Sequence, residues 1–154
     1  MVIGFSPHSL FSKLNILLIS LLFSLPVFSK ELVLVGATVA NYAALSPFEV
    51  RKIFLGYPIR RDNNLLVAII NKSDETNYQI FLQKVVHLSA RNYERRLMSK
   101  TFRTGTPTVL EVDNLPALKK KLLSNAFNVS VMWVEDVESQ SDLKVIQTLW
   151  KETN

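Results

Sequence analysis

A continuous apolar run that leads directly into a helix start is the feature that most constrains the fold of this chain. Residues 65–70 read Leu-Leu-Val-Ala-Ile-Ile, which has the length and composition of a strand covered on both faces. Ser73 follows as an N-cap, with acidic residues after it in the first helical turn. The next apolar residues recur at helical spacing and are expected to face the sheet: Tyr78, Phe81, Leu82, Val85 and Val86. A buried strand joined to an amphipathic helix indicates an α/β layer.

The remaining predicted elements also alternate along the chain. Strand patterns occupy residues 31–36, 109–112, 129–134 and 143–146, and helix patterns occupy residues 90–100 and 114–125. Strands that alternate with helices favour a mixed central sheet of about four to five strands flanked by helices. The sequence contains no internal repeat, low-complexity segment or linker rich in proline and glycine. We therefore expect a single domain over residues 30–154.

A short helix with signals at both ends is predicted within residues 45–56. Ser46 is positioned to cap its first free N–H groups, and Pro47 occupies a position where a missing N–H costs nothing. Glu49 completes a capping box with Ser46. Gly56 follows the last periodic residue, where a left-handed C-terminal cap is favoured.

The same segment carries a family resemblance. Residues 45–56 read LSPFEVRKIFLG and resemble the LS-x-x-E-[LV]-x-x-IF-LG segment of phosphate-type periplasmic substrate-binding proteins of ABC importers. Residues 102–107 resemble the F-x-G-x-x-P turn of that family, and residues 128–134 stand where it has a strand reading roughly G-x-I-G-Y-V. The resemblance is nearest to short, single-lobe, phosphate-transporter-like proteins. It implies one lobe of the periplasmic-binding-protein-like fold (type 2 superfamily) and a non-enzymatic solute-binding role linked to an ABC transporter.

The resemblance also implies a ligand site where strand 65–70 meets the next helix. In the resembling proteins this junction carries an Arg, an Asp and a Ser-Gly-Thr run that hold the oxyanion. Free N–H groups at a helix start and the carboxyl ends of strands favour such a site on physical grounds. Thr76 keeps the hydroxyl of the run, whereas Asp74 and Glu75 stand where the Ser and Gly would be, and the Arg has no counterpart. The candidate ligand-binding residues for phosphate or another small oxyanion are Asn71, Lys72, Ser73, Asp74 and Thr76.

The sequence at this junction also allows two other interpretations. Residues 73–76 also make an ordinary helix start that needs no ligand. Asp74 and Glu75 would repel an anion unless one is protonated or accepts the ligand's own proton, and Lys72 supplies a point charge rather than a bidentate fork. The alternative function is a ligand-free interaction or sensory module that has lost anion binding and contacts a membrane transporter or sensor protein.

Composition and motifs restrict the remaining function classes. The net charge of +5 is compatible with an anionic ligand, a membrane surface or simple solubility. The basic helix within residues 91–100 has the pattern of a solvated face. No nucleophile-elbow, zinc-protease, P-loop or dinucleotide-binding motif occurs, and His87 has no partner for metal binding or general-base chemistry. We therefore expect no enzymatic activity, no cofactor and no bound metal.

The N-terminal segment has the pattern of a secretory signal peptide. Residues 1–29 contain Lys13, an apolar run over 14–25 and small residues before a cleavage point after Ser29. A retained membrane anchor is the alternative, although the run falls short of the roughly 20 residues that span a bilayer. The chain has no cysteine, which excludes disulfides and a lipidated N-terminal cysteine. These features predict a periplasmic protein, and export argues against nucleic acid as a partner.

Overall fold

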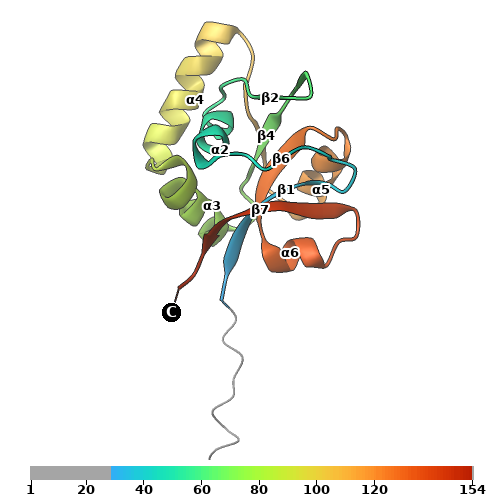
Figure 1. Ribbon diagram of the computed structural model, residues 1–154. Helices are drawn as coiled ribbons and strands as arrows, with labels where there is room; N and C mark the ends of the chain where they lie inside the picture. The colour runs from blue at the N-terminus through green and yellow to red at the C-terminus, as the bar shows by residue number, and fades with distance from the viewer. Residues whose placement is uncertain (1–28, 154) are drawn as a thin grey trace, which may run out of the picture.

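Five strands form a mixed central sheet in the order β5-β4-β6-β1-β7 (Figure 1). The structure is a computed structural model and describes residues 29–153, so the predicted leader lies outside the described residues except for Ser29. The strands are β1 (Glu31–Ala37), β4 (Val67–Asn71), β5 (Leu110–Val112), β6 (Asn128–Trp133) and β7 (Leu143–Lys151). β4 runs parallel to β5 and β6, whereas β1 runs antiparallel to β6 and β7. The predicted α/β class and mixed sheet are confirmed.

Helices cover both faces of this sheet. One face carries α2 (Pro47–Phe54), α3 (Glu75–Phe81), the π-helical segment η2 (Leu82–Val86) and α4 (Ala90–Thr104); the other carries α5 (Leu115–Leu123) and α6 (Val134–Glu138). A separate two-stranded hairpin consists of β2 (Arg60–Arg61) and β3 (Asn64–Leu65). Within the described residues, no helix combines the length and apolar character that crossing a membrane requires.

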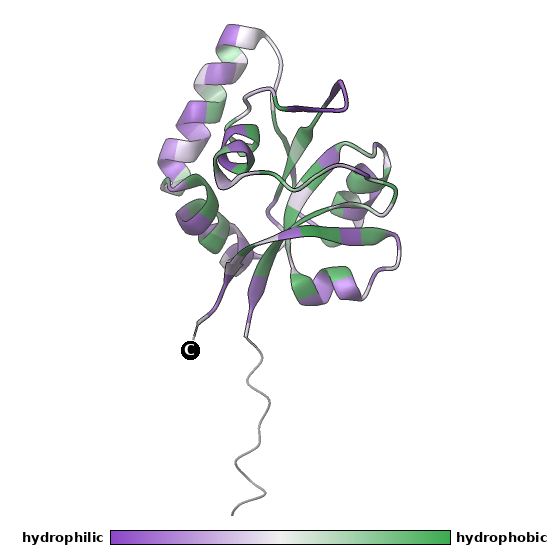
Figure 2. Cartoon of the chain, in the orientation of Figure 1, coloured by the Kyte–Doolittle hydropathy of each residue, from purple (hydrophilic) through white to green (hydrophobic). Residues whose placement is uncertain are grey.

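Side chains of the central strands alternate between two hydrophobic cores. In β1, Leu32 and Leu34 belong to the core beneath α2, α3 and α4, whereas Val33 and Val35 belong to the core beneath α5 and α6. All four side chains are fully buried. β4 divides its side chains in the same way, and Figure 2 shows that the central strands are largely hydrophobic. Burial on both faces explains why these strands read as continuous apolar runs in the sequence.

One aromatic side chain is the buried attachment point of α4. Tyr93 is the buried residue of this helix, and its hydroxyl donates a hydrogen bond of 2.6 Å to the Phe54 carbonyl. The Tyr93 ring also packs edge to face against Phe81, with 5.7 Å between the ring centroids. Figure 2 shows that many of the other residues of α4 are hydrophilic. Tyr93 is therefore the deepest anchor of α4, with Ala90 and Leu97 also packed against the core, and much of the helix is exposed to solvent.

The observed elements extend beyond some of the predicted ones. α4 continues to Thr104, through part of the segment predicted as a turn, because Gly105 with a φ of 74° supplies the left-handed C-cap. β7 continues past Ile146, since its pairing with β1 runs as far as Glu31 opposite Lys151. The hairpin of β2 and β3 and the short helix α6 were not predicted, and α6 begins without a side-chain cap that could mark its start.

Replacing Tyr93 with Phe tests the attachment of α4. We expect the Tyr93→Phe variant to unfold with a free energy lower by about 1–2 kcal/mol, because the Phe54 carbonyl stays buried without this donor. Urea unfolding followed by circular dichroism measures the change. The matched control is Tyr57→Phe, since Tyr57 is 41% exposed. Equal stability losses in the two variants would contradict the proposed attachment.

Candidate functional site

The carboxyl ends of the three parallel strands meet at one edge of the sheet. Asn71 ends β4 and lies opposite Val112 at the end of β5, and the parallel strand β6 ends nearby at Trp133. α3 begins shortly after β4, and α6 follows β6 directly. The predicted strand-to-helix junction is therefore part of a wider edge built from two strand–helix connections.

The side chain of Asn71 is buried at this junction and links β6 to the loop that precedes α3. Its side chain is 5% exposed, and its Nδ2 donates to the Val131 carbonyl at 3.1 Å. Its Oδ1 accepts from the Ser73 backbone N–H at 3.0 Å and from the Ser73 hydroxyl at 2.6 Å. The amide of Asn71 thus fixes the loop between β4 and α3 onto β6.

The N-cap of α3 is Asp74, which corrects the prediction of Ser73. Asp74 Oδ1 accepts from the Asn77 backbone N–H at 2.7 Å, and the helix begins at Glu75. Ser73 lies one residue before this cap, where its hydroxyl and its backbone N–H both donate to Asn71 Oδ1. Thr76 lies in the first turn, where its side chain is exposed.

Lys72 is held by two carboxylates. Its Nζ lies 2.7 Å from Glu111 and 3.9 Å from Glu94, and it also lies 5.4 Å from the centroid of the Tyr78 ring. Burial by itself would lower the pKa of Lys72, but the hydrogen bond and charge of Glu111 outweigh it, so the pKa is raised. The positive charge is therefore present and largely compensated.

Carboxylates give the junction an acidic character. Asp74 and Glu75 begin α3, while Glu135 and Asp136 lie in the first turn of α6. Burial raises the pKa of Asp136, and the charges of Glu135 and Asp74 raise it further. An anion at this edge is therefore favoured when it brings a proton that a carboxylate can accept. Among residues 29–153, no three His, Asp or Glu side chains are grouped so that they could hold a metal ion.

Asn77 is a buried polar residue that the sequence prediction did not include. Its side chain is 1% exposed, and neither its Oδ1 nor its Nδ2 has a hydrogen-bond partner among the described residues. A buried amide in this state costs free energy unless a water or a ligand satisfies it. The sequence gives no signal for this role, since Asn77 stands beside the apolar positions of an ordinary amphipathic helix.

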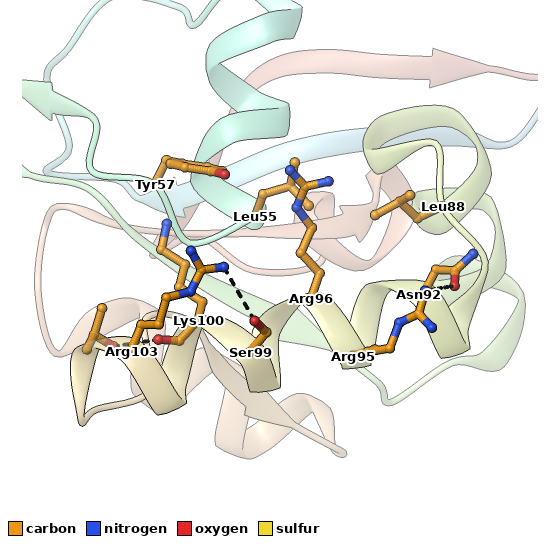
Figure 3. A pocket seen from close by; sticks show the side chains of 10 residues that line it. Leu55, Tyr57, Leu88, Asn92, Arg95, Arg96, Ser99, Lys100 and Arg103 are labelled. Carbon is orange, nitrogen blue, oxygen red and sulfur yellow. Dashed lines mark hydrogen bonds between the residues drawn. The ribbon is translucent and has the colours of Figure 1, made fainter.

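A second polar surface lies between the end of α2 and α4 (Figure 3). It is an open groove of about 800 Å³, which we call the α4 groove. Its lining contains four cationic side chains and no carboxylate; the lining residues are Leu55, Tyr57, Leu88, Asn92, Arg95, Arg96, Ser99, Lys100, Arg103 and Thr104. The sequence marked this helix as basic, but it could not show that the loop after α2 faces it.

The cations of the α4 groove contact neutral groups. Arg95 Nη2 donates to Asn92 Oδ1 at 3.1 Å, Arg103 Nη2 donates weakly to Ser99 Oγ at 3.4 Å, and Lys100 Nζ lies 3.5 Å from the Tyr57 ring centroid. A hydrogen bond from Arg96, together with the charges of Arg96, Lys100 and Arg103, lowers the pKa of Tyr57. Burial lowers the pKa of Lys100, and the neighbouring arginines lower it further. The groove therefore has a positive potential that its own side chains do not neutralise.

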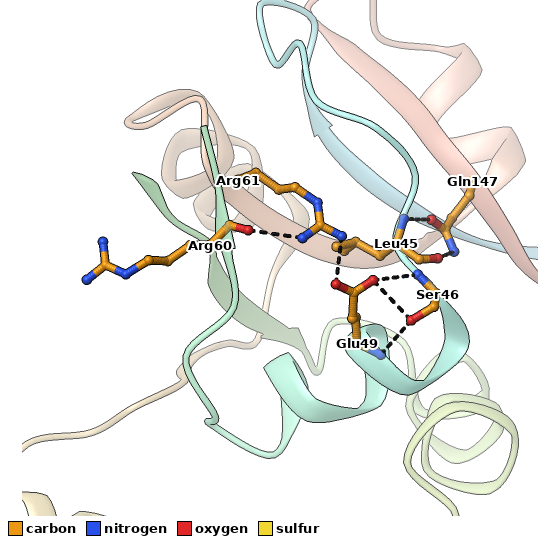
Figure 4. Close-up of polar contacts among 6 residues, drawn as sticks. All are labelled: Leu45, Ser46, Glu49, Arg60, Arg61 and Gln147. Carbon is orange, nitrogen blue, oxygen red and sulfur yellow. Dashed lines mark hydrogen bonds and ion pairs between the residues drawn. The ribbon is translucent and has the colours of Figure 1, made fainter. Parts of the chain in front are cut away.

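Leu55 and Tyr57, which line the groove, directly follow α2, and the opposite end of that helix is fixed by several polar contacts (Figure 4). The predicted capping box is present: Ser46 Oγ accepts from the Glu49 N–H at 3.3 Å, and Glu49 Oε2 accepts from the Ser46 N–H at 2.9 Å. Arg61 pairs with Glu49 at 2.8 Å, and Gln147 bonds to both the N–H and the carbonyl of Leu45. These contacts fix α2 to β2 and β7.

The fold has counterparts among solved structures. A phosphate ABC transporter substrate-binding protein from Clostridium perfringens, solved with bound phosphate, is 13% identical over 77% of this chain, with a TM-score of 0.57. An ABC-type phosphate transport receptor from Vibrio cholerae is 14% identical over 77% of this chain, with a TM-score of 0.55. The alignments cover only 45% and 46% of those two proteins. These similarities show a single-lobe, periplasmic-binding-protein-like fold.

Sequence comparisons add no family assignment. No protein family matches the sequence, and no curated protein is significantly similar to it. The assignment to this fold therefore depends on the arrangement of strands and helices in space.

The capping box makes a pH-dependent contribution to stability. The Ser46 backbone hydrogen bond and Arg61 lower the pKa of Glu49 from 4.5 to about 2. A lowered folded-state pKa stabilises the protein above pH 4.5, and this contribution is lost as the pH falls from 4.5 to about 2. We expect Glu49→Gln to remove this pH-dependent contribution. The unfolding free energies of the variant and of the unmodified protein should therefore converge as the pH falls from 4.5 to about 2. Glu138→Gln, at an exposed position, is the control. A constant difference between Glu49→Gln and the unmodified protein would contradict this role.

Proposed function

We propose that this protein is a non-enzymatic, solute-binding-like component that recognises a small oxyanion, with phosphate as the first candidate. The observation that carries the proposal is its structural likeness to two phosphate-transport binding proteins, one of which was solved with bound phosphate. The proposal further includes export to the periplasm and action beside a membrane transporter or sensor protein. Both follow from the N-terminal pattern and the family resemblance of the sequence.

The strand edge supplies the proposed ligand contacts. Asn71 and Lys72 shape and polarise the loop, while Ser73, Asp74 and Thr76 lie where the chain enters α3. Thr76 has an exposed hydroxyl, and Asp74 can accept a proton carried by the ligand. Hydrogen phosphate carries such a proton at neutral pH and sulfate does not. This edge is therefore expected to prefer phosphate to sulfate.

A single lobe also limits the strength of binding. The two-lobed design encloses a ligand by hinge closure, whereas one lobe leaves the ligand exposed to water, where each hydrogen bond contributes little. High affinity would therefore require a second copy or a docked partner.

A ligand-free interaction module is the second candidate function. The observations that favour it are the pairing of Lys72 with Glu111 and the internal hydrogen bond of the Ser73 hydroxyl to Asn71. The Ser73 hydroxyl is available to an anion only after its contact with Asn71 is broken, and the charge of Lys72 is already compensated by Glu111. A module of this kind would use its surface for a protein partner instead.

Calorimetric titration with phosphate and sulfate tests the proposal. The sample is the protein isolated in the form that cells produce, with any processing of its N-terminus left as it occurs. We expect phosphate to bind more tightly than sulfate. Asp74→Asn keeps a good N-cap but removes the proton acceptor, so the preference should fall by about tenfold, the value of one hydrogen bond to a charged group. Asp62→Asn, on the hairpin turn, is the control and should leave the preference unchanged. Absence of binding heat for both anions would eliminate the oxyanion function and leave the interaction module.

Export can be tested without any ligand. We expect the protein recovered from the periplasmic fraction to begin at Lys30, because the leader ends with small residues at the predicted cleavage point. Intact-mass measurement and N-terminal sequencing determine the first residue. Recovery of a chain that begins at Met1 from the membrane fraction would support a retained anchor instead.

A further inference from the structure

We infer that the α4 groove binds a soluble ligand that carries two or more phosphate groups. This site is separate from the strand edge discussed above and does not rest on the oxyanion proposal made for it. Four observations carry the inference: the segregation of charge on α4, the repulsion among its cations, the concave shape of the groove and the length over which the cations are spread.

Charge is divided between two faces of α4. Glu94 is the one acidic residue of this helix, and it pairs with Lys72 at the side of β5. The lining of the α4 groove contains only cations and neutral residues. In the described part of the chain, the four cations of the groove form no ion pair. The basic residues that do form ion pairs are Arg61, Lys72, Lys119 and Lys151. The cations of the groove therefore have no carboxylate beside them, unlike the paired basic residues elsewhere in the described chain.

The cations repel one another within the free protein. Arg96 and Lys100 are four residues apart on one helix face, and Lys100 and Arg103 are three apart. Like charges at these spacings destabilise a helix by about 0.2–0.5 kcal/mol per pair. Burial is the main cause of the lowered pKa of Lys100, and the charges of Arg103 and Arg96 lower it further. A bound anion would remove this repulsion, so the protein gains stability when the groove is occupied.

The shape of the groove suits a small ligand. In Figure 3 the Arg96 side chain extends toward Leu55, and Lys100 extends toward Tyr57, so these cations reach into the hollow. A volume of about 800 Å³ lies in the ordinary range for ligand pockets. Ser99 Oγ and the Tyr57 hydroxyl add hydrogen-bonding groups. A flat membrane surface would be matched better by cations that point away from the domain.

The spread of the cations sets the size of the ligand. Seven residues separate Arg96 from Arg103, which corresponds to about 10 Å along the helix axis. One phosphate ion is too short to reach both ends and carries too little charge to balance four cations. Arginine forks bind phosphate oxygens in pairs, and three of the four cations are arginines. Linked phosphate groups are longer and more highly charged than one phosphate ion, so they match the groove better in both respects.

Calorimetry with inorganic pyrophosphate at low salt tests the site, again on the protein purified as cells produce it. We expect saturable binding to one site. The double variant Arg96→Gln/Arg103→Gln should bind about tenfold more weakly, since each lost surface contact is worth up to about 1 kcal/mol. Added salt should weaken binding as well. The matched control is Lys120→Gln/Lys121→Gln, which removes two exposed charges from α5 and should leave the affinity unchanged.

Tyr57 provides a readout inside the groove. The cations lower its pKa, so a bound polyanion should move its ionisation to higher pH. Ultraviolet absorbance measures tyrosine ionisation, and the Tyr57→Phe variant identifies the contribution of this residue. An ionisation curve that pyrophosphate leaves unchanged would overturn the proposal.

Three further results would overturn the proposal. The first is the absence of saturable pyrophosphate binding at low salt. The second is an equal loss of affinity in the α4 and α5 double variants, which would show nonspecific attraction. The third is binding of phosphatidylglycerol vesicles or of a polyglutamate peptide through Arg96 and Arg103 without binding of pyrophosphate, which would assign the surface to a membrane or a protein. Retained pyrophosphate binding in Asp74→Asn would support a site independent of the strand edge.

Discussion

The burial of β4 on both faces is the constraint on which the rest of this structure depends. Ile69 and Ile70 face opposite cores, and neither is more than 1% exposed, so the polar chemistry of this strand is confined to its ends. At the carboxyl end, Asn71 binds the Val131 carbonyl and the loop that begins α3. The same helical layer then holds α4 through Tyr93 and leaves its cations at the surface. β4 thus positions the strand edge directly, and the helices packed beside it hold α4 and its groove.

The sequence predicted the elements that local chemistry specifies. The capping box of Ser46 and Glu49 and the apolar run of β4 were recognisable because the relevant residues are neighbours in the chain. The N-cap of α3 was displaced by one residue, since Ser73 bonds to Asn71 through a loop geometry that propensity does not encode. The basic character of α4 was visible as well. The groove beside α4 could not be predicted from the sequence, because Tyr57 and Leu55 come close to α4 only through tertiary packing.

The two polar surfaces have opposite electrostatic character. The strand edge combines Asp74, Glu75 and Asp136 with a compensated Lys72, so under our proposal it accepts an anion that brings a proton to share. The α4 groove has uncompensated cations, which under our proposal receive a highly charged anion. Glu94 separates the two, because it faces Lys72 and leaves the groove side of α4 without a carboxylate. This lobe, which covers under half of the length of its structural counterparts, thus presents two surfaces of different charge.

Residue-resolved NMR titration tests this separation most directly. Backbone amide shifts would be followed while phosphate, and in a second series pyrophosphate, is added to the isotope-labelled protein. The account predicts that phosphate shifts the amides of residues 71–77, whereas pyrophosphate at equal concentration shifts those of 55–57 and 92–104. Shifts of one common set of amides by both anions would contradict the division into two surfaces, as would unchanged spectra in both series.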